Sequence, residues 1–360
     1  MQPATGSAPA SQGKRNTFPW IEMLFGLVGM GGLLFINQGL GFVLVIFLFP
    51  LLGEWLLLKG AGMGGAGAAL ALIPVSLAVL GGGVGVAFAL YGSLAAWLLS
   101  PWTPVKSVRM RSVLWGVMTM GMMMFLLYQA FGSFRSLNPS YTGGLMDFLA
   151  DWFTASIAQS PQGNELLVAA YQAGYAHYGT SGEGLPAFRL GGLVILSDEV
   201  RTQLLLSLRH TLWVAFHQSA PQGVLYAGGC VALFSALVAG GQRRRRGLQC
   251  DVPPFSRWHL PRGWGLRIGV LALGYLFQGD GTPPMVGYIS VLSVAIFRFA
   301  YTVQGIAALQ FFLARSGSRW LGKLLVTGAG LWLAPDLFQI IGIFDQISPW
   351  RQLRKKQQEG

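Results

Sequence analysis

Charged residues are scarce in this chain of 360 residues. Lysine, arginine, aspartate and glutamate together make up 11% of it, whereas a soluble domain carries about a quarter. This scarcity excludes an ordinary soluble globular protein. Long apolar stretches recur instead from Trp20 to Phe344, and most of the charges lie in the short segments between them.

Cysteine and histidine are also rare, and each shortage excludes a kind of chemistry. The two cysteines, Cys230 in an apolar stretch and Cys250 in a basic one, provide no disulfide framework. The four histidines lack an H-E-x-x-H or similar spacing, so the sequence supports no zinc centre. We expect neither a bound metal nor a cofactor.

Three local patterns suggest chemistry that their context does not support. The G-x-G-x-x-G at 62–67 opens an apolar helix, whereas dinucleotide binding needs a preceding strand. The G-x-S-G at 179–182 is similar to that of rhomboid-type intramembrane proteases, but no span starts there. Methionines between 118 and 124 would suit Cu(I), yet no second cluster continues a path. An enzyme is therefore not expected.

The apolar runs predict an all-α fold, a polytopic helical membrane bundle with eight to nine transmembrane helices. Only helices and closed barrels satisfy their backbone hydrogen bonds in lipid, and runs such as 40–48 do not alternate as barrel strands do. Since about 17–25 apolar residues cross a bilayer, spans are expected near 19–36, 40–58, 64–81, 83–100, 112–132, 221–240, 264–278, 285–313 and 320–344. The distribution of basic residues does not decide whether the short stretch 264–278 crosses the membrane or only enters it from one side.

The spans divide the chain into five parts. We expect a disordered cytoplasmic tail (1–18), a Gly-rich N-terminal bundle of five spans (19–132), an extracytoplasmic or interfacial segment (133–220), a C-terminal bundle of three to four spans (221–346) and a basic polar tail (347–360). The extracytoplasmic segment carries amphipathic patterns near 144–158, 164–178 and 198–217, the last typical of a helix lying along the membrane surface. Small residues repeat at a spacing of four in the N-terminal bundle, as in Gly81 and Gly85, which predicts tight helix packing.

Basic residues determine the expected orientation. The net charge of +12 comes largely from loops between spans, including the run from Arg243 to Arg246. These loops fall on one side of the membrane, which the positive-inside rule assigns to the cytoplasm together with the N-terminus. The same rule accounts for the charge without a nucleic-acid partner, so none is expected.

Two ionisable residues lie deep inside the last two spans. Arg298 and Asp336 are each roughly 24–26 Å from the turn at 315–319, so antiparallel neighbours would bring them to equal depth. An unpaired charge in hydrocarbon costs at least ~2.5–3.5 kcal/mol, so we expect these two side chains to pair. Pro335 should kink the helix beside Asp336, and broken helices mark solute sites in many transporters.

Other polar groups within spans are Gln304, Gln339 and Glu54. Together with Arg298 and Asp336 they admit two interpretations. One is a polar clamp that holds helices together, and the other is a site for a solute.

Four features of the C-terminal part occur in a characteristic order. Pro221 begins a span that ends in the arginine run, residues 253–261 read PPFSRWHLP, residues 304–307 read QGIA, and residues 342–345 read GIFD before a basic tail. In these features the chain resembles the YybS-like family of bacterial membrane proteins, most strongly over about 221–354. The resemblance implies a helical bundle in the bacterial inner membrane and assigns no catalytic residues. The Gly-rich N-terminal half is similar, at the level of fold, to solute-binding subunits of energy-coupling-factor importers.

The sequence thus supports two functions. The first is a permease-like protein that binds or translocates a small solute, with Arg298, Asp336 and Gln304 lining or bracing the site. Because no nucleotide-binding motif is present, active transport would need a partner ATPase or an ion gradient. The alternative is a non-enzymatic membrane scaffold that binds partner proteins; membrane lipids are expected partners in both cases.

Overall fold

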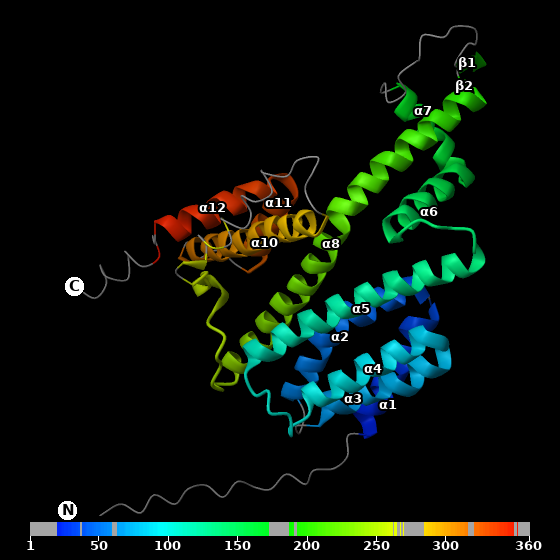
Figure 1. Ribbon diagram of the computed structural model, residues 1–360. Coiled ribbons are helices and arrows are strands. Elements are labelled where there is room, and N and C mark those ends of the chain that lie inside the picture. Colours follow the sequence, from blue (N-terminus) through cyan, green and yellow to red (C-terminus); the bar gives the residue numbers. More distant parts are fainter. Residues whose placement is uncertain are drawn as a thin grey trace, which may run out of the picture. The chain divides into compact units, whose positions relative to one another are not determined.

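The structure is a computed structural model that describes residues 20–36, 38–59, 63–172, 187–190, 193–261, 263–264, 267, 269, 284–315, 320–348 and 351. Its elements in chain order (Figure 1) are α1 (Trp20–Ile36), α2 (Gln38–Lys59), α3 (Gly64–Val79), α4 (Gly82–Leu99), α5 (Val108–Leu137), α6 (Leu145–Gln159), α7 (Pro161–Gln172), β1 (Ala187–Leu190), β2 (Leu193–Leu196), α8 (Asp198–Arg245), the 3₁₀ turn η1 (Phe255–Arg257), α10 (Pro284–Arg315), α11 (Trp320–Leu333) and α12 (Pro335–Ile347). The predicted tail 1–18, the motif at 179–182 and most of 264–278 and 347–360 lie outside the described residues.

The helical membrane-protein class is confirmed. Within the described ranges, four helices are long and apolar enough to cross a membrane, namely Gly82–Leu99, Val108–Leu137, Ser219–Arg245 and Ile289–Arg315. Each overlaps a span expected from hydropathy, and the total of eight to nine crossings stays a prediction. The described residues also include a short antiparallel hairpin, β1–β2, in which Ala187 pairs with Leu196 and which the sequence did not predict.

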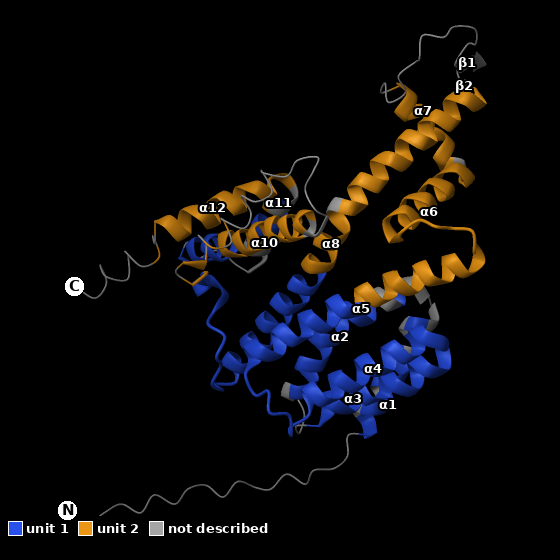
Figure 2. Ribbon diagram, viewed as in Figure 1, with its two compact units in different colours: residues 1–122, 227–259, 306–329 blue, residues 123–226, 260–305, 330–360 orange. Residues whose placement is uncertain are grey.

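The chain divides into two compact units (Figure 2): unit 1 is residues 1–122, 227–259 and 306–329, and unit 2 is residues 123–226, 260–305 and 330–360. In unit 1, α1 packs against α2 and α3, and α3 packs against α4. A Cβ atom added at Gly85 would lie 2.8 Å from the carbonyl oxygen of Ser76, and one at Gly116 would lie 2.7 Å from that of Gly228. The approach at Gly85 confirms the tight packing predicted from the small residues, and the one at Gly116 adds a second close contact that was not predicted.

The described part of the segment 133–220 contains helices where amphipathic patterns predicted them, and the last of these helices extends beyond the segment. Residues 198–217 form the start of α8, a single helix of 48 residues that continues to Arg245. The boundary expected at 220 between this segment and the next span therefore falls inside one helix, and a location along the membrane surface stays a prediction. Leu167 of α7 packs against Val200 and Leu204 of α8, and Arg209 pairs with Asp151 of α6.

The expected span 320–344 is two helices. α11 has 14 residues and α12 has 13, so they extend about 21 and 20 Å, less than the ~30 Å hydrocarbon core. The break falls at Ala334, with φ −153° and ψ 68°, and Pro335 begins α12. Pro335 lacks the N–H that would continue a helix, so the predicted kink appears as a complete interruption.

Candidate functional site

The candidate site in unit 2 is built where α10 and α12 cross. A Cβ atom added at Gly305 would lie 1.8 Å from the carbonyl oxygen of Phe338, and one at Gly342 would lie 2.1 Å from that of Tyr301. These two contacts show that the helices run antiparallel with their backbones touching. Small residues at such contacts let helices associate where lipid provides no hydrophobic driving force.

The crossing places Gln304 beside the end of α12. Its Nε2 donates to Asp345 Oδ2 at 3.0 Å and to Gln346 Oε1 at 3.1 Å, and its Oε1 accepts from the backbone N–H of Leu260 at 3.2 Å. Gln304 is 2% exposed. A buried amide with these partners holds α10, α12 and the segment after η1 together.

Asp345 and Arg351 form a buried ion pair in the same cluster. Arg351 Nε donates to Asp345 Oδ1 at 2.9 Å, and Arg351 Nη2 donates to Oδ2. Both side chains are buried. Because the arginine binds both carboxylate oxygens in a bidentate geometry, this contact is strong and directional. We call Gln304, Asp345 and Arg351 the C-terminal cluster.

The expected pair of Arg298 and Asp336 does not form. Among the residues that the structure describes, no ion pair joins them, and both side chains are exposed. Gly305 lies opposite Phe338 and Tyr301 opposite Gly342, and in this register Asp336 and Arg298 are offset along the helix axes by nine residues, about 13 Å.

The interruption at Ala334 explains this difference. The estimate of equal depth assumed one straight helix from 320 to 344. Because the helix is interrupted, the number of residues from the turn no longer gives the depth of Asp336. Asp336 lies instead in the first turn of α12, where it accepts a hydrogen bond from Gln339 Nε2 at 3.2 Å. A carboxylate is favourable at a helix N-terminus, so Asp336 has a local stabilising contact without Arg298.

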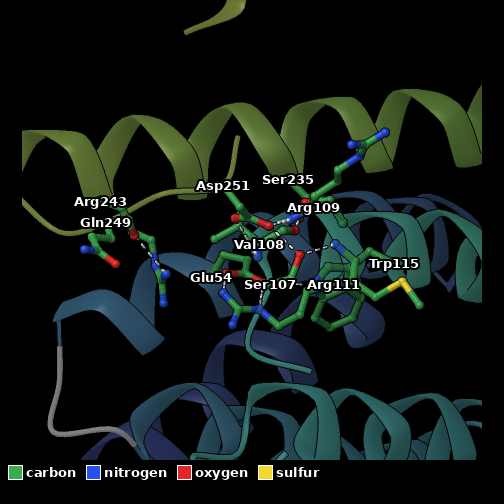
Figure 3. A network of polar contacts seen from close by, with 12 residues as sticks. Glu54, Ser107, Val108, Arg109, Arg111, Trp115, Ser235, Arg243, Gln249 and Asp251 are labelled. Carbon is green, nitrogen blue, oxygen red and sulfur yellow. Dashed lines mark hydrogen bonds and ion pairs between the residues drawn. The ribbon is translucent and has the colours of Figure 1, made fainter. Parts of the chain in front are cut away.

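Glu54 has a partner that the sequence did not reveal. In unit 1, Arg111 Nε and Nη2 each donate to the Glu54 carboxylate at 2.9 Å, and Trp115 Nε1 donates at 3.4 Å (Figure 3). Glu54 and Arg111 are buried. The expected span 112–132 leaves Arg111 outside the membrane, but Arg111 lies three residues inside α5, and Glu54 lies five residues before the end of α2. Matching the depths of these two positions could have predicted the pair.

The start of α5 is held by Asp251 from the loop after α8 (Figure 3). Its carboxylate accepts hydrogen bonds from the Ser107 hydroxyl and from the backbone N–H groups of Val108 at 3.1 Å and Arg109 at 3.2 Å. Burial by itself would raise the pKa of Asp251, but these hydrogen bonds outweigh it and lower that pKa. Asp251 therefore satisfies orphan donors at the helix N-terminus.

Metal ligation finds no support in the described part of the chain. Among those residues, no three histidine, cysteine, aspartate or glutamate side chains are grouped so that they could hold a metal ion. The expectation that no metal or cofactor is bound stays a prediction.

The long apolar helices of the described residues are consistent with an integral membrane protein of helical class. Over residues 197–346 the chain matches a family model described as "Predicted membrane protein (DUF2232)", a family of unknown function. The matched region includes Gln304, Gly305, Gly342 and Asp345, which meet at the α10–α12 crossing. No curated protein and no solved structure matches the chain. The resemblance to the YybS-like family by that name stays a prediction.

Proposed function

We propose that this protein is permease-like and binds a small anionic solute at its C-terminal helices, with Arg298 contacting the anionic group. The observation that supports this is that the charge of Arg298 is not paired with a carboxylate among the described residues. It lies within the candidate span Ile289–Arg315, its side chain is exposed, and it has no ion pair among the described residues. An uncompensated charge at this depth costs about 2.5–3.5 kcal/mol, and an anionic ligand would offset that cost.

The buried carboxylates support this assignment by contrast. Glu54 is neutralised by Arg111, and Asp345 by Arg351. Neither pair has a free charge to offer a solute. Of the arginines that lie well inside the described candidate spans, Arg298 is the one for which no acidic partner is seen. Gln304, whose amide donors are both engaged, would then brace the site and not contact the solute.

The test is anion-dependent stabilisation of the full-length protein purified in detergent. Inorganic phosphate, acetate, succinate and the polar anions extracted from the purified protein are added at constant ionic strength, and the thermal midpoint is measured. Saturating a site at 100 times Kd stabilises by about 2.7 kcal/mol. We expect one class of anion to stabilise the native protein, Arg298→Gln to abolish the effect, and Arg315→Gln, which removes an exposed arginine at the helix end, to retain it. Equal responses of all three proteins would contradict the proposal.

A second candidate function is a scaffold that binds a partner protein through α6, α7 and the first part of α8. The observation that favours it is apolar exposure outside the candidate spans, at Trp152 (52%), Leu166 and Leu206. A photo-crosslinking amino acid at position 152 would capture a discrete protein in intact cells if this function holds. Capture of lipid alone would contradict it.

A further inference from the structure

We propose that unit 1 has a binding site for the phosphate of an anionic phospholipid, formed by the basic residues at one end of α5 and α8. We call this surface the basic end. It comprises Lys106, Arg109, Arg243, Arg244, Arg245, Arg246 and Arg257, whose side chains are exposed or half-buried.

Hydrogen bonds hold the two basic segments, 106–109 and 243–246, against the loop that follows α8. Asp251 holds the start of α5 through Ser107, Val108 and Arg109, as described above (Figure 3). Arg243 Nη1 donates to the carbonyl oxygen of Gln249 at 3.3 Å, and Arg244 Nη1 donates to that of Val252 at 2.8 Å.

An apolar layer lies beneath the hydrogen-bonded loop. Val108 of α5 packs with Ala236 and Ala239 of α8 and with Val252 of the loop. The basic segments 106–109 and 243–246 are thus neighbours in a defined arrangement and not on independent loops.

The surface carries positive charge that the described residues leave uncompensated. Residues 100–110 and 243–258 contain seven basic residues and one acidic residue, Asp251. The Asp251 carboxylate is already engaged by three donors at the start of α5. Arg245 and Arg246 are exposed and form no ion pair among the described residues. Guanidinium groups in this state are suited to the oxygens of a phosphate group.

The position of the basic end indicates a lipid and not a soluble polyanion. Arg109 lies at the start of the candidate span Val108–Leu137, and Arg245 ends the candidate span Ser219–Arg245. Trp102, 80% exposed in the loop before α5, is of the residue type enriched at membrane–water interfaces. Arginines beside the ends of two spans and an exposed tryptophan therefore lie where phospholipid headgroups are found.

The experiment is a native mass spectrometry titration of the detergent-solubilised full-length chain with dioleoylphosphatidylglycerol or dioleoylphosphatidylcholine. Wild-type protein should bind the anionic lipid more tightly. Because an arginine near a membrane surface contributes about fivefold in affinity, Arg245→Gln/Arg246→Gln should weaken phosphatidylglycerol binding roughly 30-fold. The matched control Arg135→Gln/Arg315→Gln removes two exposed arginines from other helix ends and should leave it within about twofold.

Three results would overturn the proposal. The first is equal affinity of the wild type for the two lipids, and the second is equal weakening by both double variants. The third is displacement of the bound lipid by 10 mM inorganic phosphate or by a short RNA, because the basic end would then serve a soluble phosphate or a nucleic acid. Thermal midpoints of both variants, measured in parallel, show that the loss of lipid binding does not come from unfolding.

Discussion

Replacing Gly305 by alanine should force α10 and α12 apart. The added Cβ would lie 1.8 Å from the carbonyl oxygen of Phe338, and ordinary contact begins at 3.4 Å, so the backbones must separate by about 1.6 Å locally if the clash is to be relieved by translation alone. The hydrogen bond from Gln304 to Asp345 is 3.0 Å long and would not survive that shift. Overpacking of this kind costs about 1–3 kcal/mol.

The assay is the free energy of unfolding of the full-length protein in mixed micelles, followed by tryptophan fluorescence. Gly328→Ala is the matched control, because its added Cβ meets no atom within 4 Å and alanine favours a helix by about 0.5–1 kcal/mol over glycine. We expect Gly305→Ala to destabilise and Gly328→Ala to be neutral or stabilising. Equal behaviour of the two variants would refute the close crossing of α10 and α12.

Two further predictions concern carboxylates, Glu54, which is buried, and Asp251, which is exposed. Glu54→Gln should destabilise by about 3–5 kcal/mol, since it leaves Arg111 as an uncompensated buried charge, whereas Glu54→Leu/Arg111→Met should recover most of that loss. Chemical denaturation of the wild type and the two variants checks this. The lowered pKa of Asp251 means that its contribution to stability is present above the pKa of an unfolded aspartate, about 4, and is lost as the pH falls through the still lower folded value. Asp251→Asn should therefore be less stable than the wild type at pH 7, with the difference shrinking as the pH falls below about 4 in thermal unfolding measured across the acidic range.

Hydropathy and periodicity predicted the helical membrane class and several helix positions. The pattern at 144–158 corresponds to α6 (Leu145–Gln159), because a solvated amphipathic helix shows its apolar face in the sequence itself. The disturbance of the helix beside Pro335 was also predictable from the local sequence, since the missing N–H acts within one helical turn. Such features depend on neighbours in the chain and are therefore visible in it.

The pairing of charges was not predictable in the same way. Counting residues from the turn places Arg298 and Asp336 at the same depth only if residues 320–344 form one straight helix. Asp345 lies near the end of the last apolar run and was not considered, although the crossing of α10 and α12 brings it to Gln304. Pairing depends on which helices are neighbours, and hydropathy carries no information on that.

The continuity of α8 was missed for a related reason. Residues 198–217 are amphipathic and 221–240 are apolar, and this change of pattern at Pro221 predicts a boundary between two helices. The helix continues through Pro221 to Arg245. The change of pattern records a change of surroundings along one helix and not the end of the helix.

The most direct test of this account is a pair of double-mutant cycles in the C-terminal helices, measured as coupling free energies of unfolding. The account claims that Asp345 and Arg351 neutralise each other and that Arg298 is left for a ligand. It predicts that Asp345→Asn and Arg351→Gln are coupled by at least about 1.5 kcal/mol, while Arg298→Gln and Asp336→Asn are additive within about 0.5 kcal/mol. Additivity of the first pair together with strong coupling of the second would contradict it.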